Sequence, residues 1–96
     1  LATAGIHFAN VLRSLGIWDD VEPRIRTFPN GATAMRALAA STSSRPIGCT
    51  QVTEILSTSG VTLVSSLPEG HELATVYTAA VAAKAAAPDA ARALID

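Results

Sequence analysis

Cysteine is nearly absent from this chain of 96 residues, in which Cys49 is the only one. A single cysteine cannot close a disulfide within the chain, and it cannot supply the several thiolates of a cysteine-rich zinc site. The two histidines, His7 and His71, are far apart in the sequence and have no cluster of carboxylates beside them. The sequence therefore predicts no disulfide framework and no metal site, and we expect no cofactor.

An excess of charge of one sign is also lacking. Seven Lys and Arg residues against eight Asp and Glu residues leave a net charge of −1. Such a chain has no basic field that would hold a nucleic acid or an anionic membrane. Its few aromatic residues cannot form a base-stacking platform, and Trp18 is expected in the core. We therefore expect no nucleic-acid partner.

Long apolar runs are missing as well. The longest, residues 78–87, is mostly alanine and is interrupted by Lys84, so it falls short of the roughly 18–20 apolar residues that a membrane span needs. Residues 1–5 lack the basic and the apolar part of a signal peptide. Because no methionine starts the chain, we expect a processed chain or a piece of a longer one.

What the chain does contain is typical of one folded domain, with 49% apolar and 16% charged residues. Residues 3–15 have apolar side chains at helical spacing, with Thr3 as the predicted N-cap and Gly16 as the residue after the helix. Asn30 is predicted to cap a helix over residues 32–38, although Asn-Gly is also typical of a hairpin turn. Pro88 is placed to begin a last helix that ends near Ile95.

Four further segments resemble short strands, because β-branched and other apolar residues alternate loosely with polar ones. They are residues 24–28, 47–52, 61–64 and 74–81. Helices that alternate with strands along the chain predict the α/β class.

Short motifs spread over nearly the whole chain are similar to those of one family. They are Thr-Ala-Gly-Ile-His-Phe-Ala at residues 3–9, Leu-Gly-Ile-Trp at 15–18, Asn-Gly at 30–31, Gly-Cys-Thr-Gln-Val-Thr-Glu-Ile at 48–55, Leu-Pro at 67–68, Thr-Val-Tyr-Thr-Ala-Ala-Val at 75–81 and Pro-Asp-Ala-Ala-Arg at 88–92. Their order and spacing resemble the C-terminal part of the molybdate-type periplasmic substrate-binding proteins.

The resemblance implies one lobe of the type II periplasmic-binding fold, with a small mixed sheet flanked by helices. Residues 1–58 would be the second lobe of such a protein and residues 59–96 its C-terminal return segment, so that the whole chain is a single α/β domain and the first lobe is absent. A lone lobe would expose strand edges and cleft surface, so we expect the chain to self-associate.

The resemblance also implies a function. The chain would be the periplasmic solute receptor of an ABC importer, would bind a small oxyanion such as molybdate or tungstate, and would dock on a membrane permease. Another small oxyanion or a carboxylated metabolite is the alternative ligand. The alternative function is an effector-binding sensor domain of a transcription regulator, since the same architecture serves there.

The predicted site uses backbone N–H groups at helix starts, which are unpaired and lie at the positive end of the helix dipole. The resemblance carries the ligand-binding role to Ala4 and Gly31, with Thr3 adding a hydroxyl. Gln51 stands where the family has a tyrosine that contacts the ligand. Thr3 and Asn30 would equally serve as plain helix caps, and Gln51 as a polar strand residue. The predicted ligand-binding set is Thr3, Ala4, Asn30, Gly31 and Gln51.

Catalysis has less support. A pairing of Cys49 with His7 or His71 would make a nucleophile, but no motif brings them together, and Cys49 is expected to be a small buried residue. Glu54 has no partner carboxylate at a useful spacing for acid–base work. We therefore expect a binding protein that is not an enzyme.

Overall fold

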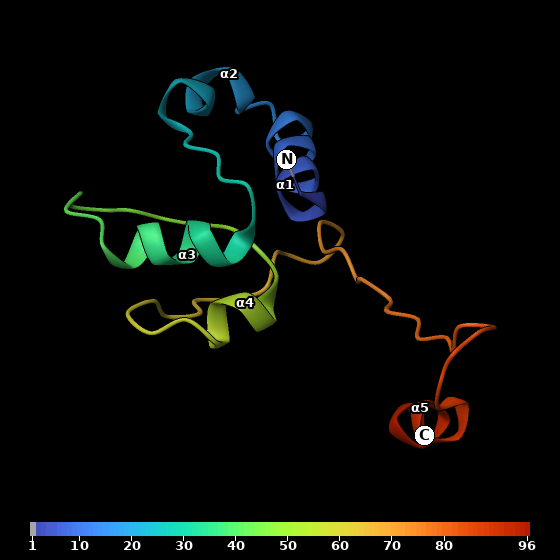
Figure 1. Cartoon of the computed structure of the whole chain (residues 1–96). Coiled ribbons are helices and arrows are strands. Elements are labelled where there is room, and N and C mark those ends of the chain that lie inside the picture. Colours follow the sequence, from blue (N-terminus) through green and yellow to red (C-terminus); the bar gives the residue numbers. More distant parts are fainter. Residues whose placement is uncertain (1) are drawn as a thin grey trace.

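The computed structural model describes residues 2–96. The elements follow in the order α1 (Thr3–Ser14), α2 (Trp18–Val21), the 3₁₀ turn η1 (Glu22–Arg24), α3 (Gly31–Ala39), α4 (Val52–Leu56) and α5 (Pro88–Ile95). In Figure 1, α2 lies at the end of α1 and α3 lies beside α4, whereas α5 stands apart at the end of a long connecting segment. Among the described residues no helix has the length and apolar character that crossing a bilayer requires.

The predicted α/β lobe with a small mixed sheet is wrong, because no strand forms within residues 2–96. Segment 24–28 begins inside η1, and segment 47–52 ends at the first residue of α4. Segments 61–64 and 74–81 run through the structure without a backbone ladder to any other described residue. β-Branched residues favour a pleated surface only where a neighbouring strand completes it, and none of these four segments has one.

The three helices predicted from the sequence are confirmed, and α5 has the predicted bounds. Asn30 caps α3 as predicted, because its side-chain oxygen accepts a hydrogen bond of 2.8 Å from the backbone N–H of Thr33. The prediction for Thr3 is wrong in detail. Ala2 is the N-cap of α1, with extended backbone and no capping side chain, and Thr3 is the first helical residue.

The end of α1 is a Schellman motif built around Gly16. Gly16 has a φ of +71°, its N–H donates to the carbonyl of Arg13 (3.0 Å), and the N–H of Ile17 donates to the carbonyl of Leu12 (3.1 Å). The two bonds satisfy carbonyls that the helix leaves unpaired. They also turn the chain sharply, so that α2 begins beside the end of α1.

The core is small and has members on α1 and on α3. The buried apolar residues among those described are Ala9, Val11 and Leu12 of α1 and Met35 of α3. Gly48 extends this core, because a Cβ at this position would lie 2.7 Å from Cε of Met35 and 3.0 Å from the side chain of Leu38. Only glycine lets the backbone approach α3 so closely, and this approach positions the residues that follow Gly48.

The chain is far less compact than its length allows. Its radius of gyration is 17.4 Å, whereas a compact chain of this length has about 12 Å. Its accessible surface of 7645 Å² exceeds the roughly 5,200 Å² expected for a compact monomer of 9.8 kDa. Large apolar side chains account for part of the difference, since Ile47, Val64 and Leu94 are each about nine-tenths exposed (92%, 93% and 88%).

Replacing Gly16 tests the Schellman motif. We expect Gly16→Ala to destabilise the chain by about 1–2 kcal/mol, because the left-handed conformation brings a Cβ close to the following carbonyl. Gly16→Asn should cost less, since asparagine tolerates this conformation. Urea unfolding followed by far-UV circular dichroism measures both changes. Equal stability of the wild type and Gly16→Ala would contradict the assignment.

The exposed apolar side chains lead us to expect that the chain self-associates. At tens of micromolar it should sediment as a dimer or a larger species. Val76 is 86% exposed on an unpaired segment, and a charge there opposes edge-to-edge pairing. Val76→Lys should therefore shift the chain toward the monomer in sedimentation velocity, whereas the control Thr62→Lys should shift it less. A monomer at every concentration would refute the expectation.

Candidate functional site

A small cavity of about 70 Å³ lies beside the first turn of α1. Three separate parts of the chain line it, namely α1, the segment that leads into α4 and the segment after it. The lining residues are Ala4, His7, Cys49, Thr50, Gln51, Leu67, Leu73 and Thr75. The cavity has the volume of two or three water molecules at about 30 Å³ each, and it is far below the roughly 300 Å³ at which pockets for drug-sized ligands begin. It suits one compact ion or molecule.

The first turn of α1 contributes Ala4 to the lining of this cavity. The N–H groups of Gly5 and Ile6 both donate to the carbonyl of Ala2, at 2.9 and 3.1 Å. For the N–H groups of Thr3 and Ala4, residues 2–96 provide no acceptor. Because α1 has twelve residues, its dipole adds a partial positive charge at this end. The start of α1 can therefore donate hydrogen bonds to an anion.

Gln51 reaches the same cavity from another element. It is the N-cap residue of α4 by its backbone, but its side chain makes no capping bond. Its Oε1 instead accepts a hydrogen bond of 2.9 Å from the hydroxyl of Tyr77. With its oxygen occupied, the amide can still donate through Nε2. The structure thus brings Ala4 and Gln51, two of the predicted residues, to one cavity.

His7 ties α1 to the turn after Leu67. Its Nε2 lies 2.6 Å from the backbone oxygen of His71, which can only accept, so Nε2 carries the proton. In the neutral ring, Nδ1 is then the acceptor. The side chain is half-buried.

Cys49 shares the cavity with His7, a proximity that no sequence motif indicated. The thiol is half-buried, and burial raises its pKa above the ordinary value because the thiolate loses hydration. A raised pKa keeps the thiol protonated at neutral pH, which makes it a poor nucleophile. Cys49 therefore presents a neutral side chain to the cavity.

The start of α3 lies outside this cavity, so the structure does not bring Asn30 and Gly31 to Ala4. The Asn30 side-chain oxygen is occupied by its cap bond. Gly31 has no room for a Cβ, because the Glu54 carboxylate and the Thr50 hydroxyl lie against it. The Thr50 hydroxyl donates to the same carboxylate. A protein carboxylate thus lies against the first residue of α3.

The sequence did not indicate four residues that line the small cavity or bond to its lining, namely His7, Thr50, Thr75 and Tyr77. Tyr77 is 26 residues from Gln51 in the sequence, so no local spacing signals their hydrogen bond. In the part of the chain that the structure describes, no three His, Cys, Asp or Glu side chains gather where they could hold a metal ion. The site is therefore one of hydrogen-bond donors around a small cavity.

Comparison with known proteins assigns the family. Residues 1–96 match the profile described as bacterial extracellular solute-binding protein. The chain belongs to this family of solute-binding proteins. No curated protein and no solved structure matches it. Membership assigns a substrate-binding role in transport, a small-molecule ligand, a transporter as partner and an extracytoplasmic location.

Alkylation of Cys49 tests the burial of the cavity. We expect its rate with iodoacetamide to rise with pH around an inflexion above the ordinary thiol pKa, because burial disfavours the reactive thiolate. Near pH 8 the folded chain should therefore react several-fold more slowly than the chain unfolded in urea, which is the control. Identical pH profiles for the two states would show that Cys49 is not buried. Cys49 is the only thiol in the chain, so every label reports this position.

Proposed function

We propose that this chain is a periplasmic solute-binding component of an ABC importer and that it binds a small oxyanion such as molybdate or tungstate. The proposal rests on the family membership and on the cavity at the start of α1. The bound ion is released unchanged to a membrane permease, so the protein catalyses no reaction. The oxyanion makes hydrogen bonds to the N–H groups of Thr3 and Ala4 and to the Gln51 amide.

The single observation that carries the proposal is the meeting of Ala4 and Gln51 at one small cavity. The backbone N–H groups and the amide Nε2 are neutral donors, and they replace part of the hydration of an anion. Thr75 adds a hydroxyl to the same lining. A cavity of about 70 Å³ favours a compact ion over a sugar or a peptide.

The charges around the cavity fit this ligand. Cys49 stays a neutral thiol because its pKa is raised, so it does not repel an anion. The Glu54 carboxylate accepts a hydrogen bond from the Thr50 hydroxyl and lies against Gly31, and Glu54 is not among the lining residues. A contribution from Asn30 and Gly31 to binding requires the Glu54 carboxylate to leave the start of α3. Without that movement, α1 and Gln51 supply the donors.

Exchange of the Gln51 amide for a carboxylate tests the proposal. Gln51→Glu keeps the shape of the side chain but replaces the donor with a negative acceptor. Since hydrogen bonds to a charged group contribute about 1.5–3 kcal/mol, we expect the affinity for molybdate to fall at least tenfold. The control Asn10→Asp makes the same chemical change on an exposed position of α1 and should alter the affinity less than twofold.

Protection of Cys49 from alkylation measures binding at this cavity, alongside calorimetric titration with molybdate, tungstate, sulfate and phosphate. A bound oxyanion should slow the reaction of Cys49 in the wild type and not in Gln51→Glu. If no oxyanion binds at millimolar concentration, or if binding leaves Cys49 unprotected, the cavity is not the oxyanion site.

A further inference from the structure

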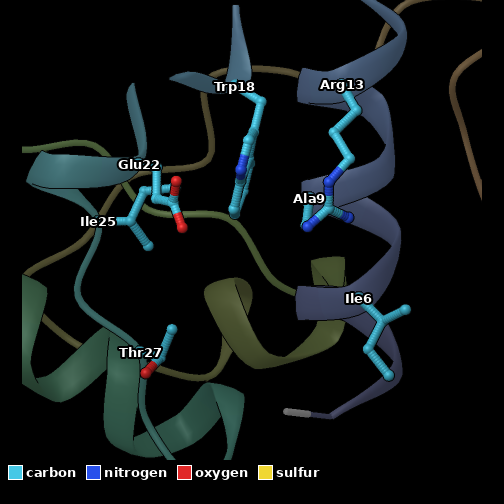
Figure 2. A pocket seen from close by; sticks show the side chains of 7 residues that line it. All are labelled: Ile6, Ala9, Arg13, Trp18, Glu22, Ile25 and Thr27. Atoms are coloured by element: carbon cyan, nitrogen blue, oxygen red, sulfur yellow. The ribbon is translucent and has the colours of Figure 1, made fainter. Parts of the chain in front are cut away.

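An open cavity of about 480 Å³ lies between α1, α2 and the segment after η1. The prediction that Trp18 is a core residue is wrong, because its side chain is half-buried and lines this cavity. Figure 2 shows the Trp18 ring between Arg13 and Glu22, and the guanidinium carbon of Arg13 lies 4.3 Å from the ring centre. One face of the ring is therefore covered by the same chain, through a cation–π contact. The longest exposed stretch of residues 2–96 lies elsewhere, over residues 72–80.

Residues 72–80 belong to the segment that leads from the body of the molecule to α5 (Figure 1). They form neither helix nor turn. No backbone hydrogen bond joins residues 72–81 to another residue of the described chain. The run Thr-Val-Tyr-Thr at residues 75–78 favours a pleated, half-buried surface. The segment is therefore a strand-like stretch whose backbone is open to pairing with a second strand.

Alternate side chains hold this segment against the body of the molecule. Leu73 and Thr75 line the small cavity, and the Tyr77 hydroxyl donates a hydrogen bond to Gln51. Residues two apart in an extended chain lie on the same face, so these three share the face toward the body. Val76 lies between them on the other face and is 86% exposed. The contacts use side chains, so they leave the backbone at both edges of the segment unpaired.

The charges that flank the segment favour one direction of pairing. Residues 73–83 carry no charged side chain, whereas Glu72 precedes them and Lys84 follows them. When two copies of this segment lie antiparallel, each Glu72 comes next to Lys84 of the partner subunit. A parallel pair would instead bring like charges together at both ends. Because Thr78 lies midway between the two charges, the antiparallel pair that matches them is centred on Thr78.

The exposed surface of the chain is large enough for such a pair. It exceeds the surface of a compact monomer by about 2,400 Å². A stable interface of standard size removes only about 800 Å² from each partner. Val76 and Tyr77, which are 86% and 79% exposed, place large apolar side chains on this surface. A second copy of the chain therefore finds both apolar area and unpaired backbone here.

We propose that residues 74–82 dock on the same residues of a second copy of this chain and form an antiparallel two-stranded ladder. Thr78 then lies opposite Thr78 of the partner subunit. The ladder ends before the turn in which the N–H of Ala85 donates to the carbonyl of Ala82 (3.1 Å). A free two-stranded ribbon is marginal in water, but here the body of each copy holds its strand before pairing. The ladder uses backbone groups, so it does not rest on oxyanion binding.

Thiol cross-linking tests the register in a Cys49→Ser chain, which has no other cysteine. Residues directly opposite in an antiparallel pair have Cα atoms about 4.5–5.5 Å apart, within the range of a disulfide. Under mild oxidation at tens of micromolar, Thr78→Cys should form a covalent dimer at least tenfold faster than the control Thr62→Cys, an exposed position outside the segment. Thr75→Cys and Val81→Cys chains should cross-link with each other at least threefold faster than either does alone. Equal rates for Thr78→Cys and Thr62→Cys would overturn the proposal.

Charges at Thr78 test the pairing without a covalent bond. Thr78→Lys and Thr78→Glu each place like charges directly opposite one another, which opposes the ladder. In sedimentation velocity each variant alone should associate more weakly than the wild type, and an equal mixture should associate at least fivefold more tightly than either alone. The controls Thr62→Lys and Thr62→Glu should show no such gain on mixing, and circular dichroism verifies that each variant is folded. Association that mixing leaves unchanged would refute the pairing.

Infrared spectroscopy detects the ladder directly, because no strand forms within residues 2–96 of the single chain. The strand component of the amide I band should grow as the wild type associates. An amide I band that stays the same from monomer to dimer would show that association uses another surface. Gln51→Glu separates this proposal from oxyanion binding, because the new carboxylate still accepts from Tyr77. Cross-linking through Thr78→Cys should persist in that variant while oxyanion binding is lost.

Discussion

The close approach of Gly48 to α3 is the contact on which the placement of the site depends. A Cβ at Gly48 would lie 2.7 Å from Cε of Met35, the most deeply buried side chain of the core. The missing side chain lets the segment before α4 lie against α3, and the next three residues then reach the first turn of α1. A larger residue at this position would push the segment away from α3 and separate Gln51 from Ala4.

The sequence predicted α1, α3 and α5 because their signals are local, but it did not predict the short α2 and α4. The apolar spacing of α1, the cap residue Asn30, the glycine at the end of α1 and the proline at the start of α5 each act within a turn or two of their own position. The strands could not be predicted in this way. Whether residues 61–64 or 74–81 form a ladder depends on a neighbour at a distant sequence position, and loose alternation does not specify one.

In the candidate site, too, features set by local signals were predicted and contacts between distant residues were not. Ala4 and Gln51 were identified from the motifs, and the structure places both at one cavity. Asn30 and Gly31 have the local geometry of a helix start, but the Glu54 carboxylate lies against it. Glu54 lies 23 positions after Gly31 in the chain. Tyr77, which donates a hydrogen bond to Gln51, lies 26 positions after it. Such contacts depend on the path of the whole chain, which residue patterns alone do not determine.

The hydrogen bond between Tyr77 and Gln51 is the last contact of the chain with the small cavity. Every lining residue of that cavity precedes it, the furthest along the chain being Thr75. The residues from 78 onward, α5 included, do not line it. Cargo as large as a fluorescent protein, or a bead or electrode surface, can therefore be joined to this stretch without obstructing the ligand there.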